Sequence, residues 1–187
     1  ITKFFISDND KVILFGKSGT GKSTLLNLIS GILSPCSGTI KVKNIITNNL
    51  SQADKDAYRA NNIGVIFQQF NILNYISPLT NILLPCFFTN FGKKNIKYFH
   101  ERAVNLAEKL NLQYNILVNA NSKNLSVGQI QRISIIRAII NEPKLILADE
   151  PTSALDDLNK KRFLNLLIDI CEKENITLLM VSHDTSI

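Results

Sequence analysis

Long apolar segments are missing from this sequence. The longest apolar stretch, Ile82 to Phe88, is short and contains Pro85, whereas a helix that spans a bilayer needs about 20 apolar residues. The sequence therefore predicts no membrane-spanning segment. If this protein works at a membrane, another chain has to cross it.

Cysteine is scarce, and charge is not concentrated in any long run. Cys36, Cys86 and Cys171 are odd in number and far apart, without the spacing of a metal site. This favours reduced thiols in a cytosolic protein. The net charge is +6, but the lysines and arginines are scattered, which is typical of a solvated surface. No recognition motif accompanies the positive charge, so we expect no nucleic-acid partner.

What is present is the composition of a globular domain. The 187 residues are 45% hydrophobic and 19% charged, enough for one domain with a sizeable core. The chain starts at Ile1 rather than methionine and stops at Ile187, shortly after an apolar run. We therefore expect a single domain over residues 1–187 that is cut at both ends.

Residues 16–23 fit the phosphate-binding pattern G-x-x-x-x-G-K-[ST] at every fixed position. Glycine lets the backbone curl so that N–H groups face phosphate oxygens, lysine supplies a positive charge, and serine offers a hydroxyl to Mg²⁺. An apolar run over Lys11–Phe15 and helical spacing over Thr24–Ile29, stopped by Gly31, place this loop between a strand and a helix. An ordinary glycine-rich turn is the weaker interpretation. The residues expected to hold phosphate are Gly16, Lys17, Ser18, Gly19, Thr20, Gly21, Lys22, Ser23 and Thr24.

The remaining pattern predicts an α/β protein with a helical insert. Continuous apolar runs, suited to parallel strands covered on both faces, occur toward both ends of the chain, and helical spacing dominates between them. The expected strands are Ile1–Ile6, Thr39–Val42, Ile63–Phe67, Leu145–Ala148 and Thr177–Val181, and the expected helices are Glu101–Leu110, Val127–Ile140 and Leu158–Glu174. We expect a nucleotide-binding core at 1–70 and 141–187, with a helical subdomain at 71–140.

Two carboxylates follow the apolar run at Leu145–Ala148. Asp149, at the carboxyl end of that strand, can reach a magnesium shell beside Ser23, and Glu150 can accept a proton from an attacking water. The alternative is a buried strand whose charged end meets solvent. The phosphate loop upstream makes this alternative the weaker one.

A second anion site is predicted where the helix at Val127–Ile140 begins. Ser126 is a natural N-cap, and its hydroxyl, the small Gly128 and the helix amino terminus together favour an anion. The alternative is a capped helix that binds nothing, which would be the better interpretation of this segment by itself.

In their order along the chain, these segments resemble the ATP-binding cassette (ABC) ATPases. The phosphate loop matches the family's Walker A motif, Asp149 and Glu150 match Walker B and the catalytic glutamate, and Leu125–Arg132 resembles the signature. The further matches are Gln68 with the Q-loop glutamine, Ser153–Asp156 with the D-loop and His183 with the switch histidine. The resemblance covers essentially the whole chain. It implies a P-loop NTPase core of the ABC type, with a mainly parallel sheet, a small antiparallel β region and a helical subdomain.

The resemblance also implies the chemistry, which is hydrolysis of ATP with Mg²⁺. The implied catalytic residues are Glu150, His183 and Gln68, the implied metal ligands are Ser23, Gln68 and Asp149, and further implied nucleotide contacts are Ser126, Gly128, Gln129 and Asp156. The implied assembly is a head-to-tail dimer, in which the signature of one copy closes over ATP held by the phosphate loop of the other.

The sequence departs from the family pattern in two places. The signature has Val127 where a glycine is usual, while Ser126 and Gly128, which the pattern places against the γ-phosphate, remain. The family also has an aromatic residue that stacks on adenine upstream of the first strand. Phe4 and Phe5 lie too close to the phosphate loop for this role, so we expect them in the core and the stacking residue upstream of the chain.

The resemblance implies an integral membrane permease as a further partner, facing Gln68 and the stretch Phe70–Thr89. This implies a peripheral position on the cytoplasmic face of the inner (plasma) membrane. The run at Gln68–Leu73 is similar to the branch that contains MacB and LolD, which indicates an export or lipoprotein-release system. An FtsE-like ATPase of cell division, and a soluble ABC ATPase acting on nucleic acid or ribosomes, are the alternatives.

Overall fold

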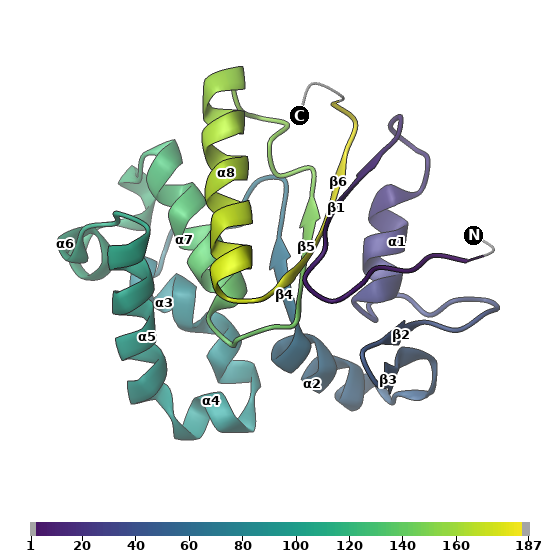
Figure 1. The fold of residues 1–187 in the computed structure, drawn as a ribbon. Coiled ribbons are helices and arrows are strands. Elements are labelled where there is room, and N and C mark those ends of the chain that lie inside the picture. Colours follow the sequence, from purple (N-terminus) through teal and green to yellow (C-terminus); the bar gives the residue numbers. More distant parts are fainter. Residues whose placement is uncertain (1–2, 185–187) are drawn as a thin grey trace.

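A computed structural model describes residues 3–184 as a parallel sheet flanked by helices (Figure 1). The sheet has the strand order β1-β6-β5-β4, and each neighbouring pair is parallel. Its strands are β1 (Lys11–Phe15), β4 (Ile63–Ile66), β5 (Leu145–Asp149) and β6 (Thr177–Ser182). Because all four run the same way, the residues that follow them lie along one edge, where ligands bind in open α/β sheets.

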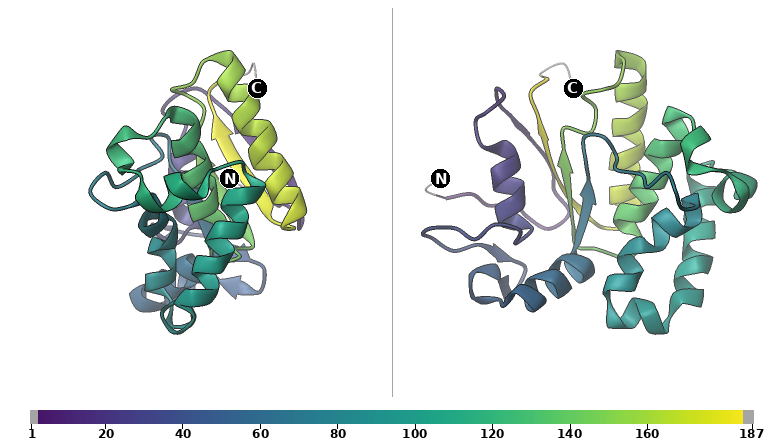
Figure 2. Two further views of the ribbon diagram at one scale, coloured as in Figure 1. Left: turned by 90° about the vertical axis from the view of Figure 1, so that its left-hand side faces the viewer. Right: turned by 180° about the vertical axis from the view of Figure 1, so that it is seen from behind.

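Helices cover both faces of this sheet, since alternate side chains of each strand point to opposite faces. Leu145, Leu147 and Leu179 pack with α1 (Lys22–Ile29) and with Tyr58 of α2 (Gln52–Asn62). Ile146 and Met180 pack on the other side with α7 (Val127–Ile139) and α8 (Asp157–Lys173). Figure 2 shows α1 on one side of the sheet and α7 and α8 on the other. Burial on both faces explains the continuous apolar runs.

The stretch between β4 and β5 is helical, and residues 71–140 contain no strand. It holds α3 (Pro78–Leu83), α4 (Asn90–Lys94), α5 (Ile96–Lys109), α6 (Tyr114–Asn119) and α7, with 3₁₀ turns η2 (Leu84–Phe88) and η3 (Ser122–Asn124). The buried Asn81 of α3 connects the loop after β4 with the turn η3. Its side chain accepts from Leu73 N at 2.8 Å and donates to Leu73 O at 3.0 Å and to Ser122 Oγ at 3.4 Å. These bonds hold the loop after β4 against the helices.

A small antiparallel pair lies beside α2, as the fold class predicts. β2 (Lys41–Val42) pairs with β3 (Ile45–Ile46), and the 3₁₀ turn η1 (Thr47–Asn49) follows. The sequence predicted β2 but not β3. It also missed α2, whose only buried residue is Tyr58, because a helix with one apolar contact has almost no periodicity to detect.

The expected first strand is wrong for its described part. Residues 3–6 form no strand, and residues 1 and 2 lie outside the described range. Phe4 and Phe5, expected in the core, are 40% and 79% exposed. Their backbone pairs with no strand between residues 3 and 184, so their side chains have no sheet to pack against.

The other expected elements are confirmed within a few residues at their ends, the largest difference being that α5 begins at Ile96 rather than Glu101. Among residues 3–184, no helix combines the length and the apolar character that crossing a membrane requires.

Candidate functional site

The phosphate loop joins β1 to α1 at the carboxyl edge of the sheet. Gly19 and Gly21 have φ of 79° and 89°, a region that glycine enters without steric cost. Gly21 is the N-cap residue of α1, and no side chain caps this helix end. The first N–H groups of α1 are therefore available to an anion, and the helix dipole favours negative charge at the same place.

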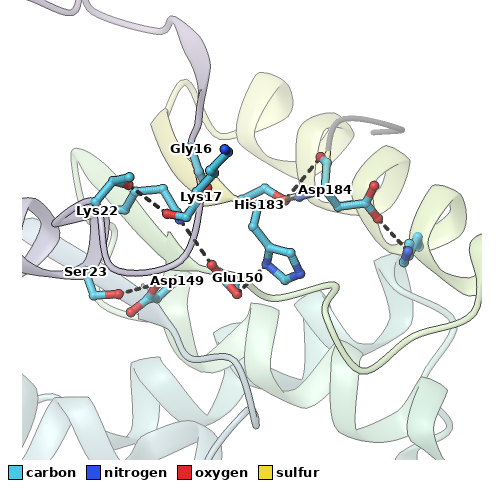
Figure 3. Close-up of polar contacts among 11 residues, drawn as sticks. Gly16, Lys17, Lys22, Ser23, Asp149, Glu150, His183 and Asp184 are labelled. Atoms are coloured by element: carbon cyan, nitrogen blue, oxygen red, sulfur yellow. Dashed lines mark hydrogen bonds and ion pairs between the residues drawn. The ribbon is translucent and has the colours of Figure 1, made fainter.

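Lys22 curls back over this loop. Its ammonium donates to Gly16 O at 2.7 Å and to Lys17 O at 3.1 Å, and lies 3.5 Å from Oε1 of Glu150. These contacts place a largely buried cation between the loop and the end of β5. Figure 3 shows the Glu150 carboxylate between Lys22 and His183.

Ser23 and Asp149 bring two hard oxygen donors together. Ser23 Oγ donates to Asp149 Oδ1 at 3.0 Å, although the residues are far apart in sequence. A hydroxyl and a carboxylate at the phosphate loop suit Mg²⁺, which keeps several waters and is usually bound by one or two protein oxygens together with substrate phosphates. The chemistry of this donor set therefore fits the metal that the sequence predicts.

Glu150 is held in an unusual backbone conformation. Its φ is 46°, and its N–H donates to Val181 O at 3.1 Å. Nδ1 of His183 lies 2.8 Å from Glu150 Oε2, where the imidazole N–H donates and the carboxylate accepts. The residues come from the ends of neighbouring strands, Glu150 after β5 and His183 after β6, so the parallel sheet sets their distance.

Gln68 lies exposed in the turn that follows β4. Ile66 is level with Ala148 of β5, so the chain leaves the sheet beside Asp149. Within residues 3–184, no hydrogen bond joins Gln68 to Ser23 or Asp149. Arg137 of α7 holds the same turn by donating to the carbonyls of Phe70 and Asn71, the latter at 2.8 Å.

The predicted signature residues do not reach the phosphate loop of their own chain. Ser126 caps α7 in a capping box, accepting from Gln129 N at 3.3 Å while its own N–H donates to Gln129 Oε1 at 2.8 Å. The helix α7 lies on the opposite face of the sheet from α1. Ser126, Gly128 and Gln129 therefore form a separate group.

Asp156 lies at the start of α8, also apart from the phosphate loop. As the N-cap residue it accepts from Asn159 N at 2.9 Å and from Asn159 Nδ2 at 2.7 Å, which lowers the pKa of the Asp156 carboxyl. Of the predicted site residues, the structure thus groups Gly16, Lys17, Lys22, Ser23, Asp149, Glu150 and His183, and leaves Gln68, Asp156 and the α7 group outside these contacts.

Sequence reasoning missed an ion pair beside this group. Lys160 Nζ lies 2.6 Å from Asp184 Oδ2, the residue after His183. A cavity of about 350 Å³ is lined by both of these residues and by Glu150, Ser153 and His183. No motif contains Lys160, and the distance of 24 residues between the partners leaves no signal in the sequence.

Comparison with known proteins relates the chain to transporter ATPases. The profile of the family described as ABC transporter matches residues 2–153. The lipoprotein-releasing system ATP-binding protein LolD of Treponema denticola is 37% identical over 184 residues, which cover 98% of this chain and 79% of the relative. The macrolide export ATP-binding/permease protein MacB of Rhodopirellula baltica is 36% identical over 97% of this chain and 26% of its own length.

A solved structure agrees with these sequence matches. The ATP-binding cassette MJ0796 in a dimeric post-hydrolysis state, bound to ADP and Pi, superimposes with a TM-score of 0.83 at 35% identity. The match covers 98% of this chain and 78% of that one. The sequence of the Methanocaldococcus jannaschii ATP-binding protein MJ0796 is 36% identical over 97% of this chain and 77% of its own length.

Proposed function

This chain belongs to the ABC transporter family, and on that footing we propose that it hydrolyses ATP between two copies of itself to power a membrane permease. As a member of this family, the chain is an ATP-binding subunit that hydrolyses ATP. The observation that carries the proposal is the convergence of Lys22, Glu150 and His183 beside the Ser23–Asp149 pair at one sheet edge.

Each residue of this group takes a role that follows from its chemistry. The loop residues from Gly16 to Thr24 bind the phosphates through N–H groups and the Lys22 ammonium. Ser23, Gln68 and Asp149 would hold Mg²⁺, which neutralises charge on the phosphates when it is bound. Glu150 accepts a hydrogen bond from the water that attacks the terminal phosphorus. The water oxygen bonds to the terminal phosphorus as the bridging P–O bond breaks, Glu150 takes the water's proton, and phosphate and ADP are released. His183 contacts the γ-phosphate.

The group on α7 acts on a second copy of the chain. Ser126, Gly128 and Gln129 lie away from their own phosphate loop, and the dipole of α7 favours negative charge at the helix start where they lie. We assign them, with Asp156, to the ATP of the partner in a head-to-tail dimer. The solved relative is dimeric, which supports this arrangement. On this basis residues 1–70 and 141–187 form the core, and 71–140 form the helical subdomain.

The permease docks beside Gln68 at the stretch Phe70–Thr89. Exposed aromatic side chains occur in this stretch, including Tyr75, Phe87 and Phe88, and aromatic residues are enriched in protein interfaces. The names of the relatives favour a lipoprotein-release or export system over an ATPase acting on nucleic acid or ribosomes. The chain would then sit on the cytoplasmic face of the inner membrane.

Replacing the carboxylate of Glu150 tests the proposal. Glu150→Gln should bind ATP with nearly unchanged affinity but lose turnover by about 100-fold or more, because the amide cannot accept the water's proton. The variant should form a stable dimer with ATP and Mg²⁺, seen by light scattering. Glu108→Gln is the control, since Glu108 is exposed and its side chain forms no ion pair or hydrogen bond in the described part of the chain. Wild-type turnover in Glu150→Gln would refute the assignment.

Recovery of the full-length protein from cells tests its partner. A tagged chain should co-purify with a membrane protein from detergent extracts, and substitution of Tyr75 and Phe88 by serine should weaken this association without changing ATP binding. Recovery with ribosomes alone would contradict a role in transport.

A further inference from the structure

The loop that carries His183 is tied to α8 by an ion pair that the roles above do not use. Lys160 Nζ lies 2.6 Å from Asp184 Oδ2, and the two side chains are only 18% and 24% exposed. Partial burial makes such a pair stronger than one in full contact with water. Lys160 also lies 3.3 Å from Asp157, but that side chain is 87% exposed, so Asp184 is the partner that can fix the lysine.

Hydrogen bonds connect the residues on either side of His183. The N–H of Asp184 donates to Ser182 Oγ at 3.0 Å, and that hydroxyl lies 3.4 Å from Asp184 O. His183 stands between these two residues, and its ring contacts Glu150. Figure 3 shows Asp184 and His183 side by side, with the imidazole directed toward Glu150. A contact that holds Asp184 in place therefore also holds the imidazole.

The other end of the ion pair is fixed to the start of α8. The N–H of Lys160 donates to Asp156 O at 2.8 Å, the first hydrogen bond of the helix. Asp156 is also tied to Asn159 through its side chain. These bonds join Asp156 to the first turn of α8, so we expect a displacement of Asp156 to displace Lys160 as well.

We propose that Lys160 is a positioning residue for ATP hydrolysis, which holds His183 on Glu150 through Asp184 and links this contact to Asp156. This inference rests on the proposed function, because it takes Asp156 to meet the second copy of the chain and His183 to meet the γ-phosphate. Closure of the dimer at Asp156 then moves the first turn of α8, and the ion pair transmits that movement to the imidazole.

Steady-state kinetics of the full-length chain test this role. Lys160→Met should lower kcat by about tenfold, since a small misplacement of a catalytic group costs this much or more, while KM for ATP stays within about twofold. Lys160→Arg should restore most of kcat because it keeps the charge. Lys161→Met is the matched control, because this exposed neighbour forms no ion pair within residues 3–184. An unchanged kcat in Lys160→Met, or an equal loss in Lys161→Met, would overturn the proposal.

Two further measurements separate positioning from general destabilisation. The double variant Lys160→Met/Asp184→Asn should lose no more kcat than Asp184→Asn alone, whereas multiplied losses would show that the residues act independently and would overturn the proposal. Hydrogen exchange at the amides of Ser182, His183 and Asp184 should be faster in Lys160→Met and unchanged in Lys161→Met. Unaltered exchange in Lys160→Met would also overturn it.

Turnover that persists in Glu150→Gln would refute the proposed function. An inactive Glu150→Gln together with a fully active Lys160→Met would refute only the role of Lys160.

Discussion

Glu150 occupies a backbone conformation that non-glycine residues rarely adopt. A φ of 46° costs on the order of 1–3 kcal/mol unless the surroundings determine it. Here the N–H of Glu150 is bound to Val181 O, and the carboxylate lies against Lys22 and His183. These contacts offset the strain, and the turn directs the carboxylate toward the phosphate loop instead of along the line of β5.

Lys22 is the residue whose charge should decide nucleotide affinity. Lys22→Met should weaken ATP binding by about 10- to 100-fold, because a charge-assisted hydrogen bond contributes about 1.5–3 kcal/mol. Isothermal titration calorimetry measures this directly. The ammonium also donates to Gly16 O and Lys17 O, so thermal unfolding should accompany the titration to show that the variant is folded.

Lys41→Met is the control for net charge, since Lys41 is an exposed residue of β2 without an ion pair in the described range. Equal affinity in Lys22→Met and Lys41→Met would count against the assignment of the phosphate loop.

Among the helices, α7 connects the region expected to meet the partner's ATP with the turn expected to meet the permease. Its first turn carries the capping box at Ser126, and Arg137 near its end holds the turn that follows Gln68. Phe70 and Asn71 in that turn have φ of 58° and 46°, so their carbonyls are directed by a strained backbone. The helix α7 therefore joins the group assigned to the partner's ATP to the turn assigned to the permease.

Substitution of Arg137 by lysine should loosen this connection. A lysine keeps the charge but cannot reach both carbonyls with one planar fork, so the free energy of unfolding should fall by about 1–2 kcal/mol. Hydrogen exchange should become faster at the amides of Phe70 and Asn71. Urea unfolding and exchange mass spectrometry provide the two measurements.

Arg162→Lys on α8 is the matched control, because Arg162 is exposed and its side chain forms no ion pair or hydrogen bond with the described residues. Protection of Phe70 and Asn71 that is unchanged in Arg137→Lys would show that the turn is held by other contacts.

At the scale of the whole molecule, the cores on the two faces of the sheet bury groups that titrate at alkaline pH. Burial raises the pKa of the Cys86 and Cys171 thiols to about 12 and also raises the pKa of Tyr58. An unfolded thiol has a pKa near 8.5. Above that pH the unfolded chain releases protons that the folded chain keeps, so stability present below pH 8.5 is lost as the pH rises toward 12.

Urea unfolding at pH 8, 9 and 10 under reducing conditions should therefore give a falling free energy of unfolding. Each buried thiol contributes up to about 1.4 kcal/mol per pH unit. Cys171→Ala should reduce the slope by the share of one group. Cys36→Ala should leave it unchanged, because Cys36 is exposed. If the free energy of unfolding changed with pH in the same way after Cys171 or Cys86 was replaced by alanine, the burial of these thiols would be contradicted.

Most of the fold was predictable because it rests on local patterns. The apolar runs that became β4, β5 and β6 and the spacing that became α7 and α8 report burial directly. The two elements that the sequence predicted wrongly or missed depend instead on contacts between distant parts of the chain. Residues 3–6 have the composition of a strand, but a strand exists only when another pairs with it, and α2 is held through Tyr58, whose hydroxyl donates to Ile29 O at 3.0 Å. Neither contact is visible in a local window of sequence.

By itself the sequence determined the phosphate loop, the carboxylates after β5, the capped start of α7 and the family, because each depends on residues adjacent along the chain. Only the tertiary structure decided which of them meet. The parallel order of β1, β6 and β5 brings Lys22, Glu150 and His183 together. The packing of α8 on the sheet places Lys160 against Asp184, whereas Ser126 at the start of α7 stays apart from the phosphate loop of its own chain. These contacts depend on strand order and on the face of the sheet to which each side chain points. The spacing of residues along the chain determines neither of them.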